Sequence, residues 1–140
     1  MNYTSSKPYY EKWQAVRDNA YNLWFNQGFA YYSLQKHDLA LKSFQKSARI
    51  ANLENTREFI GWCLYGTQKY PEAETAFTEL VNNGPRDTLS LYGLGLAERG
   101  LGKNAEARKH LEQFLQDHRP EYEGSIPQVR SLLEELIKNT

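Results

Sequence analysis

Three columns of residues recur in this sequence at intervals of 33 and then 34 residues. A glycine is followed twelve positions later by an alanine, and four positions after that by a large apolar residue. The columns are Gly28, Gly61 and Gly95, then Ala40, Ala73 and Ala107, then Phe44, Phe77 and Leu111. Periods of this length are typical of repeat architectures in which each unit is one supersecondary element. The chain is therefore predicted to be an array of three similar units.

Each unit reads as two amphipathic helices joined by a turn. In the first unit Trp24 and Gly28 share one helical face, and Ala40 and Phe44 share a second, with a polar segment at 35–38 between them. A glycine inside a helix costs about 1 kcal/mol relative to alanine. Close approach of the second helix explains why one is present there, so the pattern predicts three all-α helical hairpins.

The pattern resembles the tetratricopeptide repeat family, whose unit of about 34 residues runs W-x2-L-G-x2-Y, A-x3-F and a final proline. The matching residues are Trp24, Gly28, Tyr31, Ala40 and Phe44, then Gly61, Leu64, Ala73, Phe77 and Pro85, then Gly95, Ala107, Leu111 and Phe114. Gln27 and Glu98 depart from the pattern, in place of a leucine and a tyrosine. The resemblance implies a right-handed α-solenoid of three hairpins, at about 21–53, 54–87 and 88–120, with the recurring residues and Phe114 in its interior.

The segments outside the repeats are expected to cover the ends of the stack, which would otherwise leave apolar faces open. Residues 1–7 carry no pattern and are expected to be disordered. A helix is expected over 8–20, beginning at Pro8 and either continuing into the first repeat or breaking near Asp18; Asn104 and Ser125 are expected to be N-caps. The face of this N-terminal helix is formed by Trp13, Val16, Ala20 and Leu23. A C-terminal capping helix is expected over 125–138, with Ile126, Val129, Leu132, Leu133, Leu136 and Ile137 along one stripe and Arg130, Glu134, Glu135 and Lys138 opposite.

The charge balance argues against two classes of partner. The 17 basic and 17 acidic side chains cancel, so the chain lacks the basic surplus expected of a nucleic-acid binder. No run approaches the ~18 apolar residues of a membrane helix, and the first residues do not resemble a secretory signal. We therefore expect a cytoplasmic protein with no nucleic-acid partner and no membrane insertion.

The inventory of reactive side chains does not support an enzyme, a metal site or a cofactor. The single cysteine excludes an internal disulfide and any multi-cysteine metal site. Cys63 lies in an apolar helical segment and is expected to be a buried, inert thiol. His37, His110 and His118 lie among polar neighbours and are expected to be solvated at the surface.

The family resemblance implies a concave groove lined by the first helix of each repeat. The corresponding positions are Asn22, Phe25, Phe29 and Tyr32, then Asn55, Phe59, Trp62 and Tyr65, then Leu89, Tyr92, Leu96 and Arg99. Aromatic side chains dominate this set, and Asn55 and Arg99 would fix the backbone or a terminal charge of a bound peptide. Members of the family that clamp a terminal carboxylate use lysine, arginine and asparagine. This chain has Phe25, Phe29, Phe59, Leu89 and Gly93 at those points, so that activity is not expected.

The sequence therefore predicts a non-catalytic adaptor that binds an apolar peptide or helix of a protein partner. Two alternatives stay open. The size and repeat number also resemble the translocator chaperones of bacterial type III secretion. The groove could instead be filled by the chain's own N-terminal helix or by a second copy in a homodimer, as in a self-associating scaffold.

Overall fold

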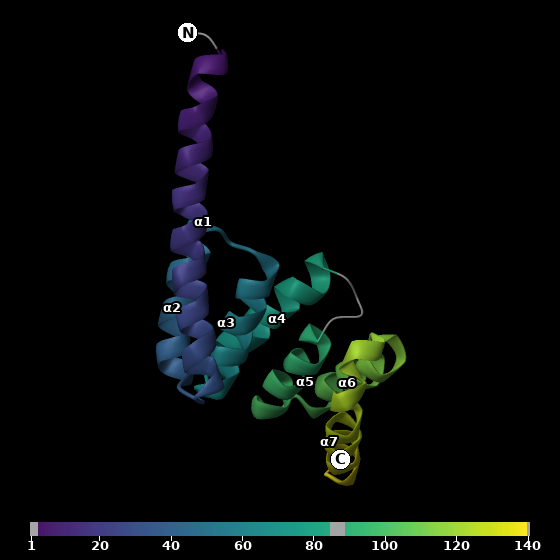
Figure 1. Ribbon diagram of the computed structural model, residues 1–140. Helices are drawn as coiled ribbons and strands as arrows, with labels where there is room; N and C mark the ends of the chain where they lie inside the picture. Colours follow the sequence, from purple (N-terminus) through teal and green to yellow (C-terminus); the bar gives the residue numbers. More distant parts are fainter. Residues whose placement is uncertain (1–2, 85–88, 140) are drawn as a thin grey trace. The chain divides into compact units, whose positions relative to one another are not determined.

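The computed structural model describes residues 3–84 and 89–139, with side chains from residue 8 onward. Within these ranges the chain forms α-helices and one 3-10 helix and no strand, which confirms the predicted all-α class (Figure 1). The elements are α1 (Tyr3–Ser33), α2 (His37–Ile50), α3 (Glu54–Gly66), α4 (Tyr70–Asn83), α5 (Ser90–Gly100), α6 (Asn104–Asp117), η1 (Pro120–Ser125) and α7 (Ile126–Lys138). Pro85 and the expected boundary between the second and third repeats lie outside the described residues.

The 33/34 period reappears in the backbone of the turns. Gln35, Gln68 and Gly102 have φ angles of 62°, 63° and 78°, the left-handed conformation that often ends a helix. In each turn the next residue is a lysine whose N–H bonds to the carbonyl oxygen five positions earlier, as in a Schellman motif. The three hairpins therefore share one turn geometry as well as one sequence pattern.

The chain divides into two compact units, Met1–Phe59 and Ile60–Thr140, and the division falls inside α3. In the first unit α1 is one continuous helix, so of the two alternatives left open by the sequence it is the continuation into the first repeat that is found, and not a break near Asp18. The helix begins at Tyr3, and Pro8 lies inside it. Adding residues to an existing helix is far easier than starting one, so the helix extends past the patterned segment.

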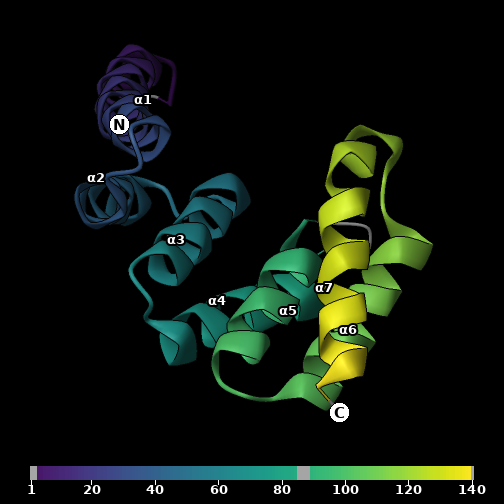
Figure 2. The ribbon, with the colours of Figure 1, turned by 90° about the horizontal axis from the view of Figure 1, so that it is seen from below.

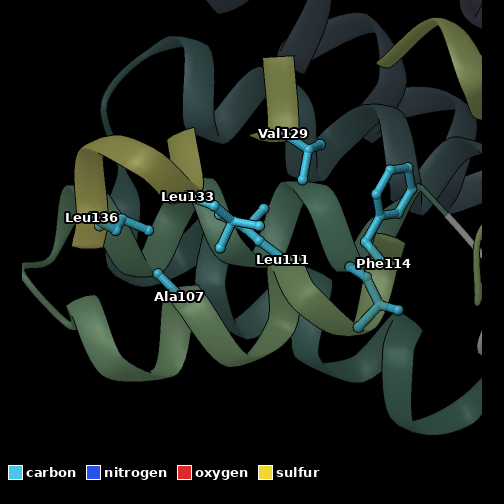
Figure 3. Close-up of a cluster of buried hydrophobic side chains, with 7 residues drawn as sticks. Ala107, Leu111, Phe114, Val129, Leu133 and Leu136 are labelled. Atoms are coloured by element: carbon cyan, nitrogen blue, oxygen red, sulfur yellow. The ribbon is translucent and has the colours of Figure 1, made fainter. Parts of the chain in front are cut away.

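The second unit contains two layers of core side chains. The first lies between α3, α4 and α5 and contains Ala73, Phe77, Leu80, Leu94 and Ala97. The second joins α5, α6 and α7, which runs beside α6 (Figure 2). In this second cluster α7 contributes Val129, Leu133 and Leu136, which point toward side chains of α6 (Figure 3).

The predicted interior is confirmed. The three glycines of the repeat pattern are buried, and the alanines and large apolar residues of the pattern are fully inaccessible, together with Phe114. A Cβ atom on Gly28 would lie 2.8 Å from the ring of Phe44, and one on Gly61 would lie 2.9 Å from the ring of Phe77. The glycines are present because the two helices of each hairpin meet at these points.

Two expected helix caps are not formed. Asn104 is the first residue of α6, and the preceding Lys103 is the N-cap, with no hydrogen bond from its side chain. Ser125 has helical backbone angles and likewise makes no capping bond, because η1 leads directly into α7. Lys103 occupies the N-cap position because it is the last residue of the shared turn, so Asn104 lies one position too far along the chain to cap α6.

Candidate functional site

A hollow of about 540 Å³ lies in the second unit. Its lining residues come from three helices, with aromatic rings on one side and α7 on the other. They are Tyr65, Tyr92, Leu96, Pro127, Gln128, Ser131, Leu132 and Glu135. We call this the tyrosine hollow. It combines three of the predicted groove positions with a wall that the sequence analysis assigned only to capping.

Packing beneath the hollow fixes the position of its lining side chains. Gly93 brings α5 onto the ring of Phe77, from which a Cβ atom at position 93 would be only 2.5 Å away. Tyr92 and Leu96 are four residues apart on α5 and therefore share one face of that helix. On the opposite wall, α7 buries Val129, Leu133 and Leu136 in the core, and the adjoining face of the same helix borders the hollow.

Trp62 supports the aromatic wall from α3. Its ring makes edge-to-face contacts with Phe77 and Tyr92, at centroid distances of 5.1 and 5.7 Å, and lies 6.3 Å from Tyr65. Such pairs add about 0.5–1.5 kcal/mol beyond the apolar area they bury. Trp62 is thus predicted to hold the two tyrosines in place, although it does not itself line the hollow.

The polar groups of the hollow are neutral or paired. Burial raises the pKa of Tyr65, and the nearby Tyr70 raises it further while Arg99 opposes this; burial and Tyr65 raise the pKa of Tyr92. Both phenols therefore remain protonated at neutral pH and can donate hydrogen bonds. Arg99 donates to Glu135 at 2.6 Å and joins α5 to α7 at the edge of the hollow. The sequence analysis placed Glu135 on the outer side of its helix, which this ion pair corrects.

The predicted groove residues of the first unit form an aromatic cluster centred on Phe59. Its ring lies 5.7, 5.9 and 5.4 Å from the rings of Phe25, Phe29 and Tyr32, and it stacks on the buried Phe44 at 5.1 Å. These side chains pack mainly against one another. Phe29 alone among the predicted groove phenylalanines of this cluster is half exposed.

The remaining predicted positions do not join either group. Asn22 and Asn55 are exposed in the first unit. Leu89 is half-buried against the C-terminal core cluster of the second unit. The sequence analysis missed the α7 wall, although a signal was present. Gln128, Ser131 and Glu135 follow helical spacing at the edge of the apolar stripe to which Leu132 belongs.

A second hollow, of about 460 Å³, lies beside α1 in the first unit. It is lined by Tyr10, Trp13, Gln14, Arg17, Asp18, Tyr21, Ile50, Ala51 and Leu53. The Arg17 guanidinium donates two hydrogen bonds to the carbonyl oxygen of Ile50, at 2.8 and 3.2 Å, where α2 ends. Tyr21 is 2.6 Å from the buried hydroxyl of Thr56. These contacts position the helices and leave the aromatic rings of Tyr10 and Trp13 exposed.

The histidines have structural surroundings, which corrects the expectation that all three are solvated. His110 is half-buried, with Nδ1 2.6 Å from the carboxylate of the buried Glu98. His118 packs on Phe114 at 5.7 Å, and the His37 ring lies 5.5 Å from Tyr32. Glu98 occupies the position where the family pattern has a tyrosine. His110 of α6 provides the hydrogen-bond partner that a buried carboxylate needs at this position.

The remaining candidates for chemistry in the described part of the chain are Cys63 and any group of metal-ligating side chains. Cys63 is fully buried, as predicted, and burial raises the pKa of its thiol to about 12. Over residues 3–84 and 89–139, histidine, cysteine and carboxylate side chains nowhere gather in threes as metal ligands would. No described helix is both long and apolar enough to cross a bilayer.

Comparisons with known proteins agree with the repeat pattern. Two profiles of the tetratricopeptide repeat family match the chain, over residues 21–52 and 60–125. A search of curated protein sequences finds no match. The fold is similar to that of the type III secretion translocator chaperone SycD of Yersinia enterocolitica, in a crystal structure of an alternative dimer. The TM-score is 0.77, the sequence identity is 18%, and the match covers 86% of this chain and 94% of that chain.

Proposed function

The chain belongs to the tetratricopeptide repeat family, and from this premise we propose that it is a non-catalytic protein-interaction module. The proposed ligand is an apolar segment of a partner protein, extended or helical, and the proposed binding site is the tyrosine hollow. The single observation that carries the proposal is the composition of this hollow, in which aromatic and aliphatic walls surround a few protonated or paired polar groups.

The size of the hollow supports a ligand of a few side chains. Its volume of about 540 Å³ falls within the roughly 300–1,000 Å³ typical of small-ligand sites. Aromatic side chains such as Tyr92 dominate interface energetics because each buries a large area with little loss of conformational freedom. The two phenol groups would donate hydrogen bonds to carbonyl oxygens of the bound segment.

The charges argue for recognition by apolar contact. Arg99 is already paired with Glu135. The sequence suggested that Arg99 fixes a terminal charge of the ligand, and for this the ligand would have to displace the ion pair. Asn55, the other residue suggested for this role, does not line the hollow. Binding is therefore expected to depend weakly on salt, since screening acts mainly on exposed charges.

The proposal is tested with a peptide selected from a random display library on the wild-type protein and then labelled with fluorescein. A roughly micromolar dissociation constant is expected, because a short peptide buries a small interface and must be ordered on binding. Leu132→Glu places a carboxylate in the hollow and is expected to weaken binding at least roughly tenfold. Ile137→Glu, on the same helix but outside the lining, is the matched control. Equal affinity of both variants would overturn the proposal.

A dedicated chaperone is the second candidate, favoured by the similarity of fold to the SycD chaperone over most of both chains. A chaperone would keep one client protein soluble, whereas an adaptor would only bind it. Light scattering by the aggregating client, once a partner is known, separates the two: suppression at equimolar amounts of this protein indicates a chaperone, and unchanged aggregation of a bound client indicates an adaptor.

A further inference from the structure

One side of α1 and of the turn after it carries mostly apolar residues at alternating intervals of four and three. The positions are Tyr9, Trp13, Val16, Ala20, Leu23, Gln27, Ala30 and Leu34. We call this row the α1 seam. Its spacing is that of the a and d positions of a coiled coil.

The seam lies beside the face by which α1 packs inside the first unit, and the two meet at Gln27, whose side-chain oxygen accepts a hydrogen bond from Ser43 of α2 at 3.0 Å. That inner face contains Gly28 against Phe44 and Arg17 against the last carbonyl of α2. On the seam, by contrast, Trp13 is 71% and Leu23 65% exposed. The N-terminal part of α1 extends beyond α2 (Figure 1). Arg17 bonds to the carbonyl oxygen of Ile50, the last residue of α2, and the described side chains before Arg17 are exposed.

An exposed surface of this kind needs a cover for two physical reasons. Most of the stability of a helix in a protein comes from burial of an apolar face. Repeat arrays also require a capped end for solubility. In the second unit α7 buries such a face, whereas within the described residues of the first unit Tyr9, Trp13, Val16 and Leu23 stay exposed on the α1 seam.

We propose that the α1 seam is a self-association surface, covered by the same seam of a second copy of this chain. The first argument is area. Tyr9, Trp13 and Leu23 are 72%, 71% and 65% exposed, and with roughly 150–250 Å² per aromatic side chain these three present roughly 300–450 Å² per copy. Val16, which is 52% exposed, enlarges this area. The seam therefore lies at the low end of specific interfaces, for which roughly 800 Å² per partner is standard.

The second argument is self-complementarity. A two-fold axis requires one surface to fit itself. In an antiparallel pair centred near residue 18, Trp13 meets Leu23 of the second copy, and Val16 meets Ala20 of the second copy. A parallel pair would instead set Trp13 against Trp13 and Ala20 against Ala20, which overfills one layer and underfills the other. The antiparallel arrangement distributes volume more evenly.

Sedimentation velocity over a dilution series tests the proposal on the full chain. Wild type is expected to dimerise. Trp13→Glu and Leu23→Glu are each expected to weaken dimerisation at least roughly tenfold, while the exposed control Ile137→Glu leaves it unchanged. Because the substituted side chains are exposed, circular dichroism should show unchanged helicity for all three variants.

Orientation is tested with Val16→Cys and Ala20→Cys, since the native Cys63 is buried. When the two variants are mixed and oxidised, the antiparallel register predicts that the mixed disulfide forms faster than either symmetric one. A wild type that stays monomeric at the highest soluble concentration, or a dimer that survives both glutamate substitutions, would overturn the proposal and assign the seam to another protein or leave it solvated. Peptide binding in the tyrosine hollow is measured separately, with Leu132→Glu, so the two proposals fail independently.

Discussion

Gly93 of α5 lies directly on the ring of Phe77 of α4, and a Cβ atom at position 93 would be 2.5 Å from the ring. Phe77 is fully buried and is already in contact with Gly61 and with Trp62. The ring therefore has no room to move away. This contact sets how closely α5, which carries Tyr92 and Leu96 of the tyrosine hollow, approaches α4.

Gly93→Ala is expected to lower the free energy of unfolding by about 1–3 kcal/mol, because overpacking a filled core forces side chains or backbone to shift. Gly124→Ala is the matched control, since no atom lies within 4 Å of a Cβ atom at that position. Urea denaturation measures both. Equal denaturation midpoints for the two variants would show that α4 and α5 can move apart without loss of stability.

The second prediction concerns the pair formed by Glu98 and His110. Removing the imidazole with His110→Ala leaves the buried carboxylate without this partner, and the free energy of unfolding is expected to fall by about 1–3 kcal/mol. The exposed neighbouring substitution Lys109→Ala should change it little. Adding Glu98→Gln to His110→Ala should recover part of the loss, and no recovery would mean that the packing of the imidazole matters more than its hydrogen bond.

The turns provide a stabilising prediction. A left-handed backbone conformation costs roughly 1–2 kcal/mol for a residue with a Cβ atom, and Gln68 adopts it with φ 63°. Gln68→Gly is expected to raise the free energy of unfolding by about 1 kcal/mol, reduced by the greater freedom of glycine in the unfolded chain. The reciprocal change, Gly102→Gln, should lower it by a similar amount. Thermal melts of the two variants that move in the same direction would contradict this.

Cys63 provides a prediction about pH. Because burial raises the pKa of its thiol to about 12, the folded protein should not react with a thiol reagent at pH 8 and should react fully once denaturant unfolds it. The unfolded chain releases this proton near the ordinary thiol pKa, so the contribution of Cys63 to stability is complete below that pKa. It declines as the pH rises toward 12, and substitution to alanine should flatten this decline.

The repeat architecture was determined by the sequence alone. Helical spacing identifies which face of each segment is apolar, and the 33/34 register shows that the same pair of faces recurs. The buried positions of Phe44, Phe77 and Leu111 followed from this pattern, because a helix that must hide its apolar face offers only one way to do so. The close approach of the second helix at Gly28 and Gly61 was predictable for the same reason.

Only the tertiary structure decided which side chains meet. Glu98 and His110 lie on different helices, and local spacing cannot pair them. The predicted groove residues have different surroundings for the same reason. Phe59 packs inside the first unit, whereas Tyr92 faces a hollow whose second wall comes from α7. A sequence pattern reports the polarity of each face, but distances between faces depend on how closely helices approach, and here that is set by contacts such as the one between Gly93 and Phe77.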